Sequence, residues 1–222
     1  MKQKITEKDN FTYLLVSLIF LLFSSACVDQ FIISGNGQSF VIAATILTMI
    51  AGIWSVRSTH YLFNTGLGLV VATVVISLLV SLLDKAELDF IHIILMLLFF
   101  LLTLKPAAQQ ALFSGHITGN SIIGSICIFL LLGLIWTMLY LLLAEFIPEA
   151  FVGIEHTNWK QNLPDLIYFS FVTLTTLGFG DLLPVSPLAR FLVYMEAIVG
   201  VFYMAIVVSS LVGAKMSNLE SN

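Results

Sequence analysis

At residues 173–181 the chain reads TLTTLGFGD, with Gly178 and Gly180 on either side of one aromatic residue. Glycine adopts positive φ at little cost, so this stretch can turn successive carbonyl groups toward one side. A line of carbonyls at membrane depth coordinates a dehydrated cation, and the Thr176 hydroxyl adds a ligand below them. A helix that Pro164 begins would direct its partially negative C-terminal end toward the same place. The stretch therefore predicts a cation site inside a membrane.

The composition places this stretch in a membrane protein. Of 222 residues, 59% are hydrophobic and 10% are charged, whereas soluble domains are about 45–50% apolar and about 25% charged. So few charges exclude a cytosolic enzyme and a soluble nucleic-acid binder. Because no nucleophile–base pair or metal-ligand cluster is apparent either, we expect no enzyme activity, no catalytic residue, no cofactor and no nucleic-acid partner. The lipid bilayer is the expected environment.

The apolar runs predict the number of membrane crossings. Six of them approach the roughly 20 residues that a spanning helix needs, namely 11–28, 39–56, 61–83, 88–104, 121–144 and 191–214. A seventh run, 166–177, is too short to cross, and non-helical backbone at membrane depth is tolerated only where it is buried or lines a cavity. We expect an all-α membrane protein with six transmembrane helices and a re-entrant helix and loop between the fifth and sixth.

The basic residues predict the orientation. With the N-terminus inside, the inner segments carry six Lys and Arg residues and the outer segments carry three. Short cytoplasmic loops hold the excess of these residues. We therefore expect a multi-pass protein of the plasma (cell inner) membrane with both termini in the cytoplasm.

The segment TLGFGD, residues 176–181, resembles the selectivity filter of the potassium channel family, whose usual form is Thr-Val-Gly-Tyr-Gly-Asp. The flanking residues agree in order and spacing over about residues 121–218. They include Ala144-Glu145 at the end of the fifth helix, Pro164-Asp165 at the start of the pore helix, the aromatic pair Tyr168-Phe169 behind the filter, and Gly200 on the inner helix.

The resemblance implies a homotetramer, in which three identical subunits complete a pore around one axis. It implies a filter formed by Thr176, Leu177, Gly178, Phe179, Gly180 and Asp181, with K⁺ as the permeant ion held by the first four. The residues expected to support the filter are Tyr168, Phe169, Thr175, Glu145 and Glu196. Gly200 is expected either as a gating hinge or as a small residue that allows close packing. If it is a hinge, helical spacing puts Met204, Val208 and Val212 toward the ion pathway.

The apolar runs and the polar interruption at residues 105–120 divide the chain into five segments. These are a cytoplasmic N-terminus (1–10), a four-helix transmembrane module (11–104), a cytoplasmic interfacial linker (105–120), a pore domain (121–215) and a cytoplasmic tail (216–222). The linker is placed there because Pro106 is expected to end the fourth helix.

Three residues depart from the family pattern. Leu177 and Phe179 replace the usual valine and tyrosine, so Phe179 lacks the hydroxyl that would hold the filter from behind. Val172 stands where some members carry a glutamate that pairs with the filter aspartate, so Asp181 lacks that partner. Glu196 lies inside the sixth apolar run, where a carboxylate is costly. It is expected either to support the filter or sense protons, or to be a hydrogen-bonded structural acid.

The fourth apolar run has no repeated arginine or lysine of the kind a voltage sensor needs, so ordinary voltage gating is not expected. Because Lys215 is followed by seven residues, no attached ligand-binding domain is expected, and gating is assigned to the membrane, the filter or a separate partner. The leading hypothesis is a potassium-selective channel with passive conduction. The alternatives are a non-selective cation channel, a transporter subunit, whose halves usually repeat, and a non-conducting membrane scaffold.

Overall fold

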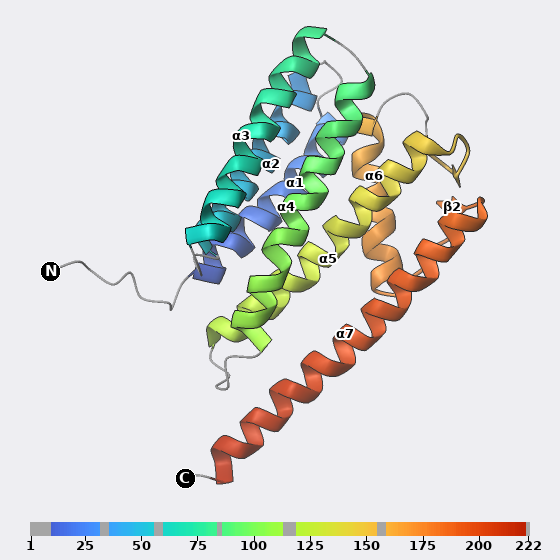
Figure 1. Ribbon diagram of the computed structural model, residues 1–222. Helices are drawn as coiled ribbons and strands as arrows, with labels where there is room; N and C mark the ends of the chain where they lie inside the picture. The colour runs from blue at the N-terminus through green and yellow to red at the C-terminus, as the bar shows by residue number, and fades with distance from the viewer. Residues whose placement is uncertain are drawn as a thin grey trace, which may run out of the picture.

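The computed structural model describes residues 10–31, 36–55, 60–83, 86–112, 119–154 and 159–220. Within them the chain forms seven helices and two short strands (Figure 1). In chain order these are α1 (Asn10–Phe31), α2 (Asn36–Ser55), α3 (His60–Leu83), α4 (Ala86–Leu112), α5 (Gly119–Phe146), β1 (Phe151–Val152), α6 (Trp159–Leu174), β2 (Leu183–Pro184) and α7 (Pro187–Glu220). Most of the expected N-terminus 1–10, part of the linker 105–120 and the last two residues of the tail lie outside the described residues.

Four helices of the described chain contain stretches long and apolar enough to cross a membrane, and the expected all-α membrane protein is confirmed in this respect. The stretches are Phe63–Val80, Leu88–Leu112, Gly119–Phe146 and Pro187–Val207. The apolar stretches Phe11–Cys27 in α1 and Ile42–Ser55 in α2 are shorter. Helix α6 has 16 residues, fewer than the roughly 20 that a crossing requires.

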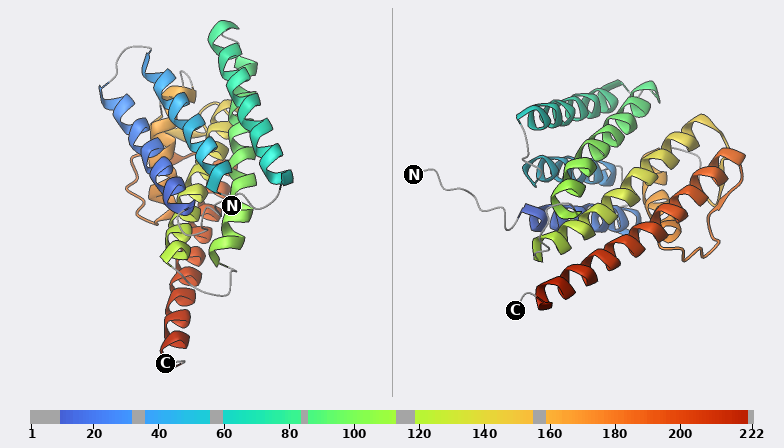
Figure 2. Two further views of the ribbon diagram at one scale, coloured as in Figure 1. Left: turned by 90° about the vertical axis from the view of Figure 1, so that its left-hand side faces the viewer. Right: turned by 60° about the horizontal axis from the view of Figure 1, so that its bottom comes forward.

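Helix α5 lies at the centre of the helix bundle. Both α1 and α4 pack against it, and α6 and α7 contact it as well. Figure 1 and the right-hand view of Figure 2 show α3 and α7 on opposite sides of α5. Glycine allows α5 and α4 to approach closely, since a Cβ added at Gly124 would lie 2.7 Å from the Cβ of Ala111 on α4. Small residues at helix crossings are typical of membrane bundles.

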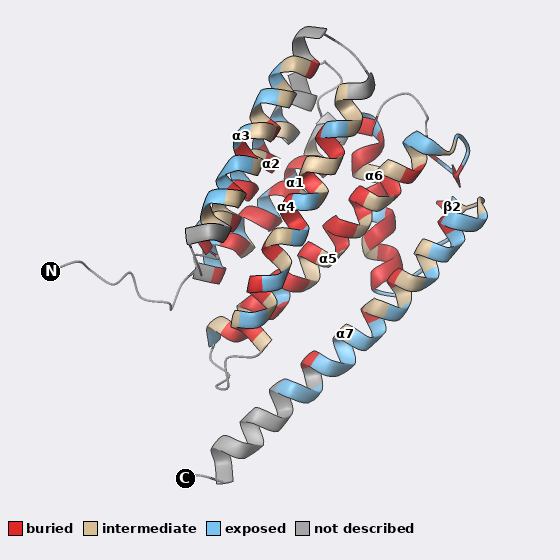
Figure 3. Cartoon of the chain, in the orientation of Figure 1, coloured by how far each residue is buried: buried red, intermediate tan, exposed pale blue. Residues whose placement is uncertain are grey.

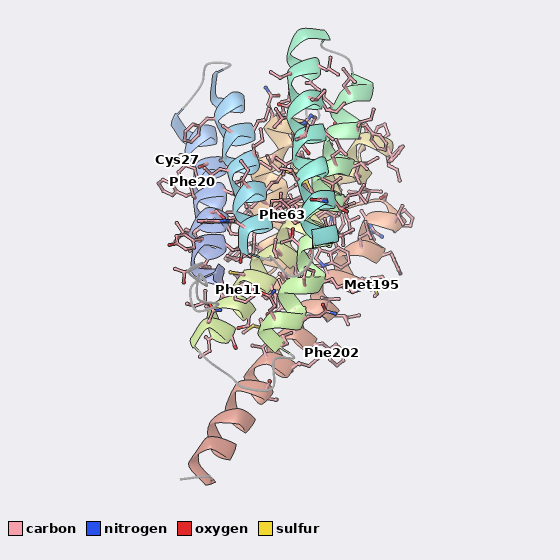
Figure 4. The ribbon with its side chains drawn as sticks, turned by 60° about the vertical axis from the view of Figure 1, so that its left-hand side comes forward. Phe11, Phe20, Cys27, Phe63, Met195 and Phe202 are labelled. Atoms are coloured by element: carbon pink, nitrogen blue, oxygen red, sulfur yellow. The ribbon has the colours of Figure 1, made fainter. Side chains whose placement is uncertain are left out.

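Burial differs sharply between α5 and α7. Most of α5 and α6 is buried, whereas most of the described part of α7 is exposed (Figure 3). Most of the exposed side chains of α7 are apolar, and Phe202, labelled in Figure 4, is 64% exposed. One chain therefore leaves an apolar helix face without a protein partner.

The prediction that Pro106 ends the fourth helix is wrong. Helix α4 continues through Pro106 to Leu112, so residues 105–112 of the expected linker belong to α4. Proline removes one hydrogen bond, to the carbonyl of Leu102, and bends a helix without necessarily ending it. Pro106 is buried, and the contacts of α4 with α5 hold the helix on both sides of it.

Candidate functional site

The stretch quoted first follows the end of α6, and we call its residues 176–181 the filter segment. The backbone φ is positive at every second residue, namely Thr176 (60°), Gly178 (56°) and Gly180 (81°). The two glycines are the residues from which the sequence predicts this conformation. Positive φ at Thr176 has no signal in residue type, because side chains with a branched Cβ rarely adopt it.

Hydrogen bonds to the last turn of α6 fix where the filter segment begins. The carbonyl of Val172 accepts the amide of Leu177 at 2.9 Å and that of Gly178 at 3.4 Å. The amide of Thr176 donates to Thr173 O at 2.9 Å. The Thr175 hydroxyl donates to Phe171 O at 2.6 Å. Thr175 thus secures the end of α6, and any movement of α6 moves the filter segment with it.

The side chains of the filter segment face away from the rest of the chain. Leu177 is 61% exposed and Phe179 is 69% exposed. Two large apolar side chains that are exposed this close together in one loop are unfavourable in water. Their exposure indicates a surface that a single chain does not complete.

The C-terminal end of the filter segment is held by Tyr168 and by a two-residue strand pair. The Tyr168 hydroxyl donates to the Asp181 carboxylate, which lowers the pKa of Asp181 and raises the pKa of Tyr168. Asp181 therefore has a partner even though Val172 is not a glutamate. Strand β2 pairs antiparallel with β1. A Cβ added at Gly153, whose φ is 97°, would lie 2.6 Å from Asp181 O.

Glu196 lies behind the filter segment and joins three helices. It is 0% exposed. The Tyr140 hydroxyl of α5 donates to Glu196 Oε2, and Ser170 Oγ of α6 lies 2.6 Å from Glu196 Oε1. Ser170 Oγ also lies 2.8 Å from Gly133 O. This carboxyl group therefore ties α7 to both α5 and α6.

The expected aromatic pair separates into two roles. Tyr168 is 39% exposed, whereas Phe169 is buried. The Phe169 ring packs against Tyr140 with centroids 5.3 Å apart and against Phe151 at 5.6 Å. Phe169 thus belongs to an aromatic cluster that joins α5, β1 and α6, while Tyr168 contacts the filter segment directly.

Gly200 lies where α7 crosses the end of α6. A Cβ added there would lie 2.0 Å from Leu174 O, so the packing role expected for Gly200 has a geometric basis. Helix α7 runs through Gly200 without interruption, and the hinge stays a prediction. Met204 is 52% exposed, and the side chains of Val208 and Val212 lie outside the described residues.

Two contacts involve Asp89, which lies in the first turn of α4. Glu145 is exposed at the end of α5 and lies close enough to Asp89 for the two carboxylates to repel each other. The Trp159 indole donates to Asp89. No pattern in the sequence indicated the contacts of Asp89, Tyr140 or Ser170, because each depends on how two helices pack.

Comparisons with known proteins agree with the predicted resemblance. Residues 125–215, which cover most of α5 and the elements after it, match a protein family described as "Ion channel". The inward rectifier potassium channel Kirbac3.1 of Paramagnetospirillum magnetotacticum is 31% identical over 82 residues, which make up 37% of this chain and 25% of that relative. No solved structure matches the chain. The resemblance to the potassium channel family is confirmed for this part of the chain.

Proposed function

We propose that this protein is a homotetrameric, potassium-selective channel that conducts passively through residues 176–181. The observation that carries the proposal is the positive φ at Thr176, Gly178 and Gly180 directly after a short helix. Residues with positive φ alternate here with residues of ordinary φ, and this alternation brings successive carbonyls to one side, as a cation pathway requires. The sequence relationship to a potassium channel supports the choice of ion.

In this proposal the chain crosses the membrane six times. Helices α1 to α5 and α7 span the plasma (cell inner) membrane, and both termini lie in the cytoplasm. Helix α6 enters the membrane from outside, and the chain returns to the same side through the filter segment. The four-helix module is residues 11–104, the linker 105–120 and the pore domain 121–215. The 16 residues of α6 and the excess of inner lysine and arginine support this arrangement.

Three further subunits would cover what one chain leaves exposed. The apolar face of α7 includes Val201, Phe202 and Ile206, which are 54%, 64% and 60% exposed. The side chains of Leu177 and Phe179 in the filter segment are also exposed. Four copies around an axis bury both surfaces and surround the pathway with four filter segments.

Conduction would follow from the chemistry of the segment. The carbonyls of Thr176, Leu177, Gly178 and Phe179, with the Thr176 hydroxyl, replace the hydration shell of K⁺. The lowered pKa of Asp181 keeps a negative charge at the outer end, which attracts cations. Below the segment, Gly200 would act as the hinge, and Met204, Val208 and Val212 would line the inner cavity.

Gating would not depend on a voltage sensor. Helix α4 carries Asp89 and Lys105 near its ends, and its sequence has no row of arginines between them. The stimulus would act at the filter or through a separate partner.

The test is potassium flux from proteoliposomes that contain the purified protein, under an outward potassium gradient. We expect a barium-sensitive flux that sodium and N-methylglucamine do not carry. Gly178→Ala is expected to abolish it, because alanine is strained at a φ of 56°. Gly68→Ala is the matched control, since a Cβ added there meets nothing within 4 Å. Equal sodium and potassium flux would instead establish a non-selective cation channel. Absence of flux in wild-type protein would favour the transporter or scaffold.

A further inference from the structure

The first turns of α4 and α6 meet at a polar contact outside the filter segment. Trp159 Nε1 donates to Asp89 Oδ1 at 2.7 Å. Lys160 Nζ lies 3.7 Å from the same oxygen. Trp159 is 3% exposed. The contact joins the four-helix module to the helix that precedes the filter segment.

Apolar contacts surround this polar contact. The rings of Phe90 and Phe146 meet edge to face with centroids 4.7 Å apart. The His92 and Trp159 rings lie 5.3 Å apart. We call the residues Asp89, Phe90, Phe146, Trp159 and Lys160 the α4–α6 junction. It binds the start of α4 to the end of α5 and to the start of α6.

The charge of Asp89 suits its position. A helix N-terminus is partially positive and is stabilised by a nearby acid. Helix α6 has no acid in its own first turn and carries Lys160 there instead. Asp89 therefore provides, from the neighbouring module, the negative charge that α6 lacks.

The hydrogen bond is the stronger of the two links. The Lys160 and Asp89 side chains are 15% and 16% exposed, and their charged atoms are 3.7 Å apart. A long ion pair that reaches solvent contributes little. The indole donor is buried and binds a carboxylate at 2.7 Å, and hydrogen bonds to ionised acceptors are about twice as strong as neutral ones.

Helix α6 connects this junction to the filter segment. It begins at Trp159 and ends at Leu174, and Val172 O holds the first amides of the filter segment. Ser170 ties the same helix to Glu196. A shift of the first turn of α6 therefore changes the position of its last turn relative to the other helices.

We propose that Asp89 is a positioning residue through which the four-helix module sets the open probability of the filter. The inference rests on the proposed channel function. The module holds α6 in the conducting position, and loss of the Asp89–Trp159 hydrogen bond shifts the filter toward a non-conducting state. The ions and the carbonyls that bind them are unchanged, so unitary conductance and selectivity stay the same.

The experiment records single channels of the full-length protein in planar bilayers. Asp89→Ala and Trp159→Phe are expected to lower the open probability about tenfold, as loss of a hydrogen bond to a charged group implies. Asp89→Asn keeps an acceptor for Trp159, and Lys160→Met removes the ion pair together with the contact of Lys160 Nζ over the Trp159 ring. Both are expected to stay within about threefold of wild type. Lys105→Met, an exposed charge at the other end of α4, is the control and is expected to have no effect.

Three results would overturn the proposal. They are an unchanged open probability in Asp89→Ala, an equal loss in Asp89→Asn and Asp89→Ala, and an altered unitary conductance in either. Trp159→Phe provides the same test from α6 if Asp89→Ala does not fold.

A second measurement separates this proposal from the channel function itself. Hydrogen–deuterium exchange of peptides that cover residues 175–182 does not require conduction. We expect faster exchange there in Asp89→Ala and Trp159→Phe than in Asp89→Asn. If wild-type protein carries no current, the channel function fails, and this exchange result alone decides whether Asp89 positions α6. Unchanged exchange would refute the positioning role.

Discussion

Replacement of Glu196 by alanine is expected to destabilise the protein, whereas replacement by glutamine is expected to be nearly neutral. The expectation follows from counting protons around the fully buried side chain. Ser170 Oγ lies 2.6 Å from Glu196 Oε1 and 2.8 Å from Gly133 O, but a hydroxyl has one proton. If Ser170 donates its proton to Gly133 O, the hydrogen bond between Ser170 Oγ and Glu196 Oε1 needs a proton on the carboxyl group of Glu196. Glutamine supplies that proton from its amide and still accepts the Tyr140 hydroxyl through its oxygen.

The magnitude follows from what each variant leaves without a partner. In Glu196→Ala the Tyr140 hydroxyl, which is 0% exposed, loses its acceptor, at a cost of about 1–3 kcal/mol. Ser170 keeps Gly133 O and loses little. The cavity left by the removed carboxyl group adds about 1 kcal/mol or more. We expect a total of about 2–4 kcal/mol for alanine and less than about 1 kcal/mol for glutamine.

Thermal unfolding of the purified protein in one detergent measures the difference. For a chain of this length, 1 kcal/mol corresponds to about 2–4 °C in Tm, so alanine is expected to lower Tm by at least about 4 °C. Tyr140→Phe serves as the matched control. It removes the Tyr140 hydroxyl itself, so no buried donor is left without an acceptor. If glutamine lowers Tm as much as alanine does, a negative charge on Glu196 is required, and the proton count is wrong.

Three further variants test other contacts. Gly200→Ala would place a Cβ 2.0 Å from a carbonyl oxygen of α6, and we expect destabilisation of about 1–3 kcal/mol or more. Gly68→Ala serves as the control in the same thermal assay and is expected to leave Tm unchanged or slightly raised. Gly153→Ala combines a φ of 97° with a Cβ 2.6 Å from Asp181 O; we expect a cost of about 1–3 kcal/mol and a reduced potassium flux, and unchanged flux would show that this contact does not hold the filter segment. Tyr168→Phe removes the hydrogen bond that lowers the pKa of Asp181. A carboxylate with a lowered pKa stabilises the fold above its ordinary pKa and stops doing so as the pH falls through its folded pKa. The variant is therefore expected to lack most of this stabilisation above the ordinary pKa, and to lose current at a higher external pH than wild type because Asp181 is protonated there. Carbon-13 NMR of the Asp181 carboxyl group checks the shift.

The sequence predicted the parts of the fold that depend on length and on residue type. Apolar runs marked the helices, and Gly178 and Gly180 marked the positive φ that the structure has at both. The error at Pro106 arose because proline removes one hydrogen bond and the neighbouring helices decide whether the helix ends there. Nothing in the residue types predicted the strand pair between β1 and β2, which has two residues on each side.

The supporting contacts of the site were predictable only in part. A carboxyl group inside an apolar run indicated that Glu196 must have partners, but the sequence could not say which. Tyr140 is 56 residues away and Ser170 is 26 residues away, and both meet Glu196 only because α5, α6 and α7 cross at this level. For the same reason, Asp89 and Trp159, which are 70 residues apart, carried no pattern that linked them.

The packing of α1 and α4 against α5 of the same chain has a consequence for biosynthesis. The four-helix module is made first and finds its docking surface on the next helix to leave the ribosome. In the proposed homotetramer, each subunit can complete this contact during membrane insertion, before it meets another copy. Assembly would join subunits whose modules are already in place, and a variant of the α7 face that blocks assembly should still yield a monomer with a docked module.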